Sequence, residues 1–270
     1  MENEKKGTSI VVTSGKGGVG KTTTSANIGT GLAMLGYSVV VLDADIGLRN
    51  LDVVMGLENR IVYDIVDVVE KNCKLKQALI KDKRHENLYL LPAAQTKDKT
   101  AVSSSQMVEL VNELKENYDY IIIDSPAGIE QGFQYSIAGA DEAIIVTTPE
   151  VSAVRDADRV IGILEANEIY QPKLIVNRIR QDMVKRGDMM NIEDILDILA
   201  VKLLGVVPDD ENVVISTNRG EPVIMDEKAL SGKAYRNIVR RIIGEEVDFL
   251  NLENTNQGKL SKMMKILFGR

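Results

Sequence analysis

The chain has 270 residues, enough for one large α/β domain with a substantial buried core. Its 40 acidic and 33 basic side chains give a formal net charge of −7, which argues against a protein that binds nucleic acid over its whole surface. One cysteine and one histidine exclude intramolecular disulfides, a structural zinc site and an intrachain iron–sulfur cluster, and indicate a reducing compartment. The first residues lack an apolar signal-peptide core, and no run of about 18 apolar residues is present to span a membrane.

Strand-like and helix-like segments alternate along most of the chain. The strand-like runs are continuously apolar, which is typical of a parallel sheet that is buried on both faces. The alternation predicts right-handed crossovers and an α/β fold with a doubly wound, mostly parallel sheet and helices on both faces. The predicted strands are Ser9–Thr13, Ser38–Asp43, Leu88–Pro92, Tyr120–Asp124, Ala143–Thr148, Lys173–Val176 and Leu203–Val207. The predicted helices are Thr23–Leu35, Val62–Glu70, Ser104–Asn117, Val151–Ala166, Ile192–Ala200 and Ala229–Ile243.

Composition divides the chain into four parts. We expect a disordered N-terminus over residues 1–7 and a single α/β domain, without internal repeats, over residues 8–250. Residues 251–258 read NLENTNQG, a polar stretch without periodicity that predicts a flexible tether. Residues 259–270 form a separate C-terminal segment.

The segment Lys259–Arg270 has an amphipathic pattern. Its apolar residues recur at helical spacing, while Lys262 and Lys265 face the other way and no acidic residue follows Glu253. This pattern predicts a short interfacial helix that lies in an anionic membrane leaflet. The alternative is an ordinary C-terminal helix docked on the domain. The apolar stripe consists of Leu260, Met263, Met264, Leu267 and Phe268.

A phosphate-binding motif follows the first predicted strand. Residues 15–22 read GKGGVGKT, which satisfies G-x-x-x-x-G-K-[ST] between a strand and a helix. Glycines let backbone N–H groups turn toward a phosphate, and the helix N-terminus adds its positive end. Lys21 would reach the β- and γ-phosphates, and the Thr22 hydroxyl would bind Mg²⁺. The alternative is a glycine-rich turn with an incidental lysine.

The same loop contains a second lysine, Lys16, which an ordinary P-loop does not require. One interpretation is a solvated surface side chain. The other is a cation that neutralises the charge of a transferring phosphate, held beside its own loop so that it reaches the nucleotide of a partner chain.

Three carboxylates stand at the ends of predicted strands. Asp43 ends the second strand and Asp45 follows two residues later, and Asp124 ends the Tyr120–Asp124 strand before Ser-Pro-Ala-Gly. Open α/β sheets bind ligands at the carboxyl ends of their strands. Each aspartate alone could be a helix cap or a turn residue. Together with the P-loop they predict a metal–nucleotide site in which Asp124 acts as the Walker B acid.

The motifs GKGGVGKTT, DADIGLRNLD and DSPAG resemble those of the deviant-Walker-A P-loop ATPases, the ParA/MinD family. The stretches LIKDKR, LPAAQTKDK and PEVSAVRDADRVIGIL are similar to its septum-site-determining branch, and the similarity runs over residues 8–250 and the final segment. The resemblance implies an ATPase that dimerises with ATP, associates with the membrane and positions a division-septum inhibitor for division site selection. ATP hydrolysis would release it from the membrane. Its location would be cytoplasmic and peripheral on the cytoplasmic face of the cell membrane.

The resemblance also implies roles for individual residues. Lys16, Lys21 and Asp45 would be catalytic, with Lys16 acting on the partner's phosphates and Asp45 positioning the attacking water. Thr22, Asp43 and Asp124 would hold Mg²⁺, and Pro126–Gly128 would form a switch turn. The nucleotide-binding residues would be Gly15, Lys16, Gly17, Gly18, Val19, Gly20, Lys21, Thr22, Thr23, Glu150, Asn177, Pro208 and Asp209.

The implied partners are a second copy of the chain, anionic lipids through Lys259–Arg270, a MinC-like division inhibitor and a topological regulator. The two proteins would dock on the helix that carries Ser152, Arg155 and Asp156. For Arg155 and Asp156 the alternative is an exposed helical charge pair. No specific nucleic acid is expected.

Two other functions are compatible with the same fold. A partition ATPase that works on nonspecific DNA would need a basic surface, which the net charge of −7 disfavours. A metabolic enzyme, such as a nucleotide-dependent synthetase or a reductase partner, would need a second substrate pocket or cluster cysteines.

Overall fold

The computed structural model describes residues 6–98, 100–129 and 131–252. Its centre is one eight-stranded sheet in the order β3-β4-β2-β5-β1-β6-β7-β8, parallel except for the short edge strand β3, which runs antiparallel to β4. The predicted α/β fold class is confirmed. The strands are β1 (Thr8–Thr13), β2 (Val39–Asp43), β3 (Ile80–Lys81), β4 (Leu88–Leu91), β5 (Tyr120–Asp124), β6 (Glu142–Thr147), β7 (Lys173–Ile179) and β8 (Lys202–Pro208).

The strand order places β1 between β5 and β6, with Val11 opposite Ile123 on one side and Ala143 on the other. The chain builds the sheet outward from β1 in both directions, so the strand order reverses at this point. Ligands of open α/β sheets bind outside the carboxyl ends of strands at such a reversal. The fold therefore directs attention to the loop that follows Thr13.

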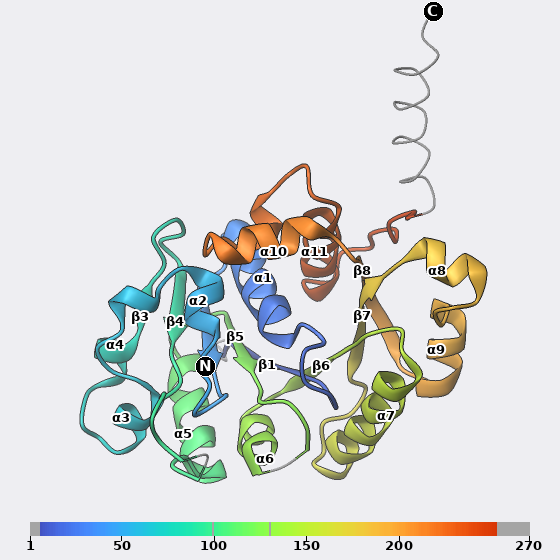
Figure 1. The fold of residues 1–270 in the computed structure, drawn as a ribbon. Coiled ribbons are helices and arrows are strands. Elements are labelled where there is room, and N and C mark those ends of the chain that lie inside the picture. The colour runs from blue at the N-terminus through green and yellow to red at the C-terminus, as the bar shows by residue number, and fades with distance from the viewer. Residues whose placement is uncertain (1–5, 99, 130, 253–270) are drawn as a thin grey trace, which may run out of the picture.

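Helices cover both faces of the sheet (Figure 1). One layer contains α1, α2, α10 and α11, and the other contains α5, α6 and α7. Within the described residues, no helix is long and apolar enough to cross a membrane. The helices are α1 (Lys21–Met34), α2 (Leu51–Met55), α3 (Ile65–Val69), α4 (Leu75–Ala78), α5 (Ser104–Lys115), α6 (Gln131–Ala138), α7 (Val151–Ala166), α8 (Gln181–Arg186), α9 (Ile192–Leu199), α10 (Glu211–Asn218) and α11 (Leu230–Ile242), with 3₁₀ turns at Glu58–Arg60 and Val223–Met225.

Each face of the sheet has its own apolar core, because alternate residues of the buried strands point to opposite sides. Val11, Val40 and Ile123 belong to the core under α5, α6 and α7. Val12 and Val41 belong to the core under α1 and α11. Burial of this aliphatic surface on both faces fixes the carboxyl ends of the strands as a rigid platform.

The end of the described chain is held against the edge strand β8. The Arg241 guanidinium donates to the carbonyl oxygen of Leu204 in β8 at 3.0 Å, and to those of Val247 and Asp248 at 2.9 and 2.8 Å. It also lies 4.1 Å above the Phe249 ring centre. Residues 244–252 thus form a strap across the edge of the sheet.

The boundaries of the expected terminal segments can be compared with the described residues. The Gly7 amide donates to the Lys115 carbonyl at 2.9 Å, so the described backbone is hydrogen-bonded before β1 begins. Leu252, placed in the expected tether, is buried with 6% of its surface exposed. Residues 1–5, the rest of the tether and the predicted helix Lys259–Arg270 lie outside the described residues.

Candidate nucleotide site

The predicted P-loop joins β1 to α1 at the point where the strand order reverses. Gly20 caps the helix with φ +100°, in the left-handed region, and Lys21 is its first residue. A Cβ at Gly20 would lie 2.4 Å from Nδ2 of Asn177, so only glycine fits here. At the other end of the loop, a Cβ on Gly15 would lie 2.3 Å from the Asp156 carbonyl oxygen in α7. The loop is therefore packed tightly at both ends.

Asn177 is hydrogen-bonded to the backbone of the P-loop. This side chain, one of the nucleotide-binding residues implied by the resemblance, is buried at the carboxyl end of β7 and donates through Nδ2 to the Val19 carbonyl at 2.8 Å. Its Oδ1 accepts the Arg178 amide at 2.9 Å, where Arg178 has φ +58°. The structure brings Asn177 to the phosphate loop itself, a contact that no local pattern in the sequence indicated.

The two lysines of the loop have different surroundings. Lys21 is 8% exposed, and burial lowers the pKa of its ammonium group, while attraction to Asp124 and Asp45 opposes that shift. Lys16 is much more exposed, and its Nζ lies 3.1 Å from Glu150 Oε2 and 3.4 Å from Ser152 Oγ. Lys16 is therefore paired with α7 and its N-cap within its own chain.

The predicted metal ligands Asp43 and Asp124 lie side by side, because β2 and β5 pair with these two residues in register. Each is 1% exposed. Burial raises the pKa of Asp124 to about 6, although Thr22, Lys21 and Ser25 lower it in part. Burial and the neighbouring Asp124 raise the pKa of Asp43 well above its ordinary value.

This carboxylate pair fits a divalent cation, whose charge would relieve both desolvation and mutual repulsion. No cluster of three or more His, Cys, Asp or Glu side chains suited to a metal occurs in the part of the chain that the structure describes. A cation here would complete its shell with the Thr22 hydroxyl, waters and phosphate oxygens, as Mg²⁺ does at nucleotide sites.

Ser25 is a member of the site that the sequence analysis missed. Its hydroxyl donates to Asp124 Oδ1 at 2.8 Å and to the Lys21 carbonyl at 3.1 Å. Ser25 stands four residues after Lys21 in α1, so the two share a helix face. That spacing was the signal that could have identified it.

Asp45 stands in a loop that we call the Asp45 loop, residues 44–50. The Ala44 amide donates to the Asp124 carbonyl at 2.9 Å, and the Asp45 amide donates to Asp43 Oδ1 at 2.9 Å. The Asp45 carboxylate is close enough to shift the pKa values of both Lys21 and Asp124. The structure thus brings Asp45 to the buried charges at the strand ends.

Two of the predicted nucleotide-binding residues, Pro208 and Asp209, line a cavity of about 490 Å³ beyond the carboxyl ends of β7 and β8. The Asp209 amide donates to the Ile179 carbonyl at 3.0 Å. Arg180 and Leu252 also line the cavity, and neither was singled out from the sequence.

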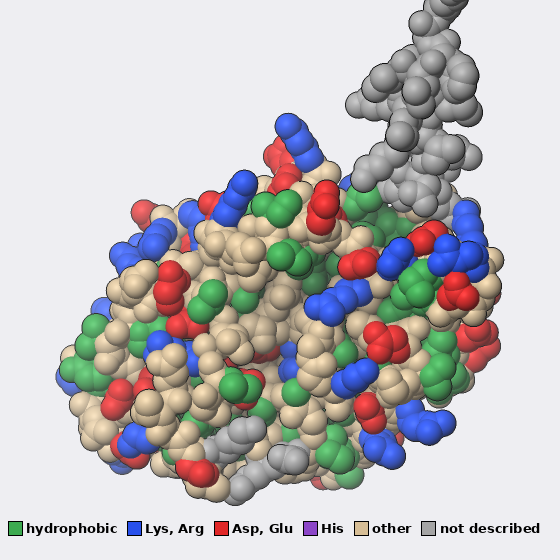
Figure 2. All heavy atoms as spheres, viewed as in Figure 1, with side chains coloured by type: hydrophobic (Ala, Val, Ile, Leu, Met, Phe, Trp, Pro, Cys, Tyr) green, Lys and Arg blue, Asp and Glu red, His purple; other side chains and the backbone are tan. Residues whose placement is uncertain are grey.

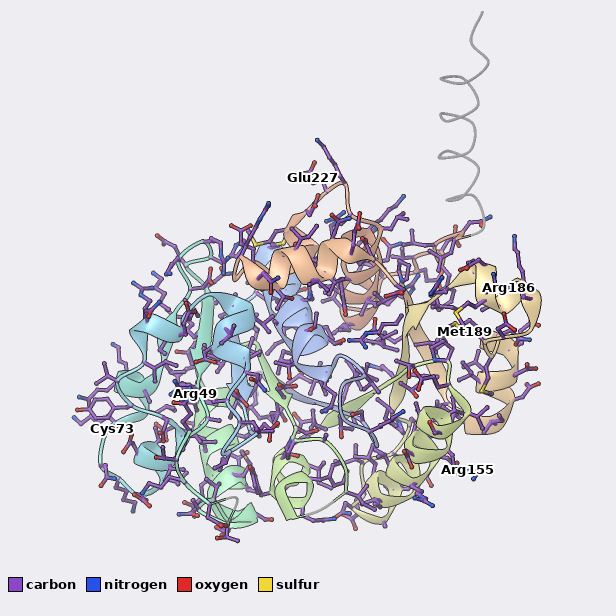
Figure 3. All side chains as sticks on the ribbon, in the orientation of Figure 1. Arg49, Cys73, Arg155, Arg186, Met189 and Glu227 are labelled. Atoms are coloured by element: carbon purple, nitrogen blue, oxygen red, sulfur yellow. The ribbon has the colours of Figure 1, made fainter. Side chains whose placement is uncertain are left out.

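The predicted regulator surface lies on α7. Asp156 packs by its backbone against Gly15 and pairs with Arg159 at 3.6 Å. Arg155 is exposed on the α7 side of the molecule (Figure 3). Cys73 lies at the opposite side of that view, beside α4, and takes no part in the nucleotide site.

Comparisons with known proteins show the family of this chain. The sequence family CobQ/CobB/MinD/ParA nucleotide binding domain matches residues 10–223 of this chain. The septum site-determining protein MinD of Bacillus subtilis is 60% identical over 265 residues, covering 97% of this chain and 98% of the relative.

Two solved structures are similar over most of their length. The MinC:MinD cell division protein complex of Aquifex aeolicus matches with a TM-score of 0.85 and 52% identity, covering 90% of this chain and 98% of that one. MinD of Pyrococcus horikoshii, complexed with Mg-ADP, matches with a TM-score of 0.80 and 29% identity, covering 87% and 95%. The resemblance found in the sequence is confirmed, and the chain belongs to the CobQ/CobB/MinD/ParA family of nucleotide-binding P-loop ATPases.

Proposed function

We propose that this protein is a division-site-selection ATPase that dimerises with ATP, associates with the membrane and positions a division inhibitor there. The observation that carries the proposal is the arrangement of two loop lysines, one buried beside Asp124 and one held at α7. A single chain uses one P-loop lysine on its own phosphates, so the second is available to another chain. The similarity to septum site-determining proteins over 97% of the chain supports the biological role.

The site supports ATP hydrolysis chiefly by positioning and charge neutralisation. Lys21 and the loop amides would hold the phosphates, and Asp45 would orient the attacking water. Bound Mg²⁺, held by Thr22, Asp43 and Asp124, would neutralise charge on the phosphates. The buried pair Asp43 and Asp124 would in turn be held ionised by the cation.

Dimerisation would move Lys16 from its own chain to the partner's nucleotide. Its present partner Glu150 is an exposed carboxylate, and an exposed ion pair contributes only about 0–1 kcal/mol. That contact is weak enough to exchange for a phosphate. Hydrolysis would therefore require two chains.

Membrane attachment is inferred from the sequence of Lys259–Arg270. Each basic residue near an anionic surface contributes about 1 kcal/mol, and one short helix binds weakly and reversibly. Two helices on an ATP dimer gain an effective concentration that raises avidity about 10²–10⁴-fold. The protein would thus be peripheral on the cytoplasmic face of the cell membrane in its ATP state, and hydrolysis would release it.

We infer that partner proteins bind α7, on the surface with Ser152, Arg155 and Asp156. A solved relative forms a MinC:MinD complex, and we infer a MinC-like inhibitor and a topological regulator as partners of this chain. Because the backbone of Asp156 packs on Gly15, a partner seated on α7 would contact an element that touches the P-loop.

The DNA-binding alternative receives no support from the visible charge distribution. Lys, Arg, Asp and Glu side chains are interspersed over the face in Figure 2, without a basic stripe. Retention on DNA-cellulose at physiological salt would revive that alternative.

The test is co-sedimentation with anionic vesicles in Mg-ATP, in Mg-ADP and without nucleotide. We expect pelleting only with Mg-ATP and release as ATP is consumed. The variant Asp45→Ala should pellet with Mg-ATP and stay bound, because it would keep the phosphate loop while losing hydrolysis. Equal pelleting in all three nucleotide conditions would overturn the proposed switch.

A further inference from the structure

Tyr135 in α6 connects the two loops that flank the phosphate site. The side chain is 2% exposed, and its hydroxyl donates to the Ala44 carbonyl. The Ile46 backbone amide faces the same oxygen closely enough to lower the pKa of the phenol. Ala44 and Ile46 are the residues immediately before and after Asp45, so one hydroxyl contacts the backbone on both sides of that carboxylate.

The position of α6 makes this contact a link between the site's loops. The helix begins at Gln131, shortly after residues 125–129, the loop that follows Asp124. The Ala44 amide already donates to the Asp124 carbonyl at 2.9 Å. Ala44 is therefore fixed through its N–H by the end of β5 and through its C=O by Tyr135.

The hydroxyl is chemically suited to hold this backbone at any working pH. Burial raises the pKa of the Tyr135 phenol well above its ordinary value, and the nearby charges of Asp45 and Asp43 raise it further. The phenol thus stays protonated and keeps donating. The phenol oxygen donates to the backbone just before Asp45 and faces the amide just after it, so its contacts bracket a single functional side chain.

We propose that Tyr135 is a positioning residue for ATP hydrolysis, which holds the Ala44–Ile46 backbone so that the Asp45 carboxylate orients the attacking water. The inference rests on the proposed role of Asp45. In the step concerned, the water oxygen forms a bond to the γ-phosphorus and the bond from that phosphorus to the β–γ bridging oxygen breaks. The electron pair leaves with ADP, one proton stays on the attacking oxygen and the other moves to another oxygen of the inorganic phosphate.

The first experiment measures steady-state ATPase kinetics and nucleotide affinity of Tyr135→Phe, which keeps the ring and removes the hydroxyl. A misplacement of about 1 Å in a reacting group can cost about 10²-fold, so the partial loosening here should lower kcat about tenfold. The KM for Mg-ATP, the affinity for ADP and ATP-dependent dimerisation should not change. Tyr135→Met also removes the hydroxyl but fills the space differently. It should lower kcat by a similar factor, which would show that the effect comes from the lost hydroxyl and not from altered packing.

Ser9→Ala is the matched control. The Ser9 hydroxyl donates to the Gly139 carbonyl at 2.7 Å and accepts the Asp141 amide at 3.0 Å, the same bracketing arrangement at the opposite end of the sheet. Its loss should lower stability to a similar degree and leave kcat unchanged. If Ser9→Ala lowers kcat as much as Tyr135→Phe, the effect is general loosening and the inference is wrong.

A double-mutant cycle with Asp45→Asn separates this inference from the proposed function. If Tyr135 acts through Asp45, adding Tyr135→Phe to Asp45→Asn should lower kcat no further. Additive losses would show that Tyr135 acts by another route and would overturn the inference. An unchanged kcat in Tyr135→Phe beside a low kcat in Asp45→Asn overturns it while the proposed function stands. An unchanged kcat in Asp45→Asn defeats the proposed role of Asp45 itself.

Discussion

Lys16 and Lys21 stand five residues apart at the P-loop, and the first is exposed while the second is buried. We therefore expect different losses of function when each is replaced. Lys21→Ala should abolish nucleotide binding, because a buried cation beside the phosphate site is lost. Lys16→Ala should retain measurable nucleotide binding and lose ATP-dependent dimerisation, with turnover lowered by the 10³–10⁵-fold range typical of a cation supplied in trans, about that of an arginine finger. Titration with a fluorescent nucleotide, size-exclusion chromatography in Mg-ATP and phosphate release distinguish the two. A monomeric Lys16→Ala protein with normal turnover would contradict the role in trans.

The glycines of the P-loop differ in what surrounds them, which predicts unequal costs for the same substitution. Gly18 and Gly20 both have positive φ, but a Cβ at Gly18 meets nothing within 4 Å, whereas at Gly20 it lies 2.4 Å from Asn177 Nδ2. Gly18→Ala should lower the free energy of unfolding by about 1–2 kcal/mol from backbone strain alone. Gly20→Ala should cost about 1–2 kcal/mol more, because the Asn177–Val19 hydrogen bond is also displaced.

Denaturant unfolding without nucleotide measures both variants. In an Asn177→Ala background the extra cost of Gly20→Ala should disappear, since the clashing amide is absent. A Gly20→Ala penalty equal to that of Gly18→Ala in the unmodified chain would show that Asn177 moves aside freely.

At the scale of elements, an arginine joins two helices that lie next to the site. Arg84 donates to the Met55 carbonyl at the end of α2 at 2.7 Å and to the Gly220 carbonyl after α10 at 2.8 Å. Asp82 holds the guanidinium at 3.0 Å and accepts the Arg84 and His85 amides. We call Arg84 and Asp82 the clamp. Since α2 follows the Asp45 loop, the clamp connects the element after that loop to the residues that follow α10.

The clamp predicts a pH-dependent contribution to stability. Burial alone would raise the pKa of Asp82, but the hydrogen bonds from Arg84 and His85 outweigh it and lower the pKa below its ordinary value. A lowered folded-state pKa contributes stability above the unfolded value and loses it as pH falls below about 4. Asp82→Asn should therefore lower the free energy of unfolding by about 1–2 kcal/mol at pH 7. That difference should shrink as the pH of the unfolding experiment falls below about 4.

Glu70→Gln, which breaks the exposed pair of Glu70 with Lys97, is the control for removing a carboxylate charge. It should change stability little at either pH. A constant difference between Asp82→Asn and the unmodified chain down to pH 3 would contradict the ion-pair explanation.

Elements with strong periodicity were predictable, and short elements set by tertiary contacts were not. The helix predicted at Val151–Ala166 has those bounds in α7, and every predicted strand is present. Helix α10 was missed because its apolar residues are consecutive and Val214 and Ile215 stay exposed, so it has no stripe to detect. Its start depends on the Asp210 side chain, which caps the Asn212 amide.

The same distinction applies to the site. The P-loop and the acids Asp43 and Asp124 follow from local motifs at strand ends, and the structure places these acids in register. The support of Val19 by Asn177 joins residues 158 positions apart, and the contact of Tyr135 with Ala44 joins residues 91 apart. Such contacts depend on strand order and helix packing, which local sequence patterns do not specify.

At the scale of the whole molecule, membrane attachment should depend on which apolar residue of the C-terminal segment is changed. Leu267 lies within the predicted stripe and Ile266 lies off it. Leu267→Glu and Ile266→Glu therefore add the same charge at neighbouring positions on different sides of the helix. Leu267→Glu should abolish ATP-dependent pelleting with anionic vesicles, and Ile266→Glu should only weaken it. Added salt should weaken attachment of the unmodified chain, because the basic residues are screened.

Deletion of residues 259–270 should also abolish pelleting while ATP-dependent dimerisation remains. Light scattering of the truncated chain in Mg-ATP checks the dimer. Persistent pelleting of the truncated chain would mean that another surface binds the lipid.

The strap held by Arg241 determines where a mechanical load enters the molecule. A protein attached through its carboxyl end is pulled at that end whenever the surface or a bound partner moves. Here a force on the carboxyl end would act on residues 247–249. The Arg241 guanidinium donates hydrogen bonds to two carbonyls of this strap and to the Leu204 carbonyl of β8. The force then spreads along the edge strand, and β7, β6, β1 and β5 separate that strand from β2, which leads into the Asp45 loop. A pull on the carboxyl end would therefore transmit little strain to the Asp45 carboxylate, which lies beyond β2 on the far side of the sheet order.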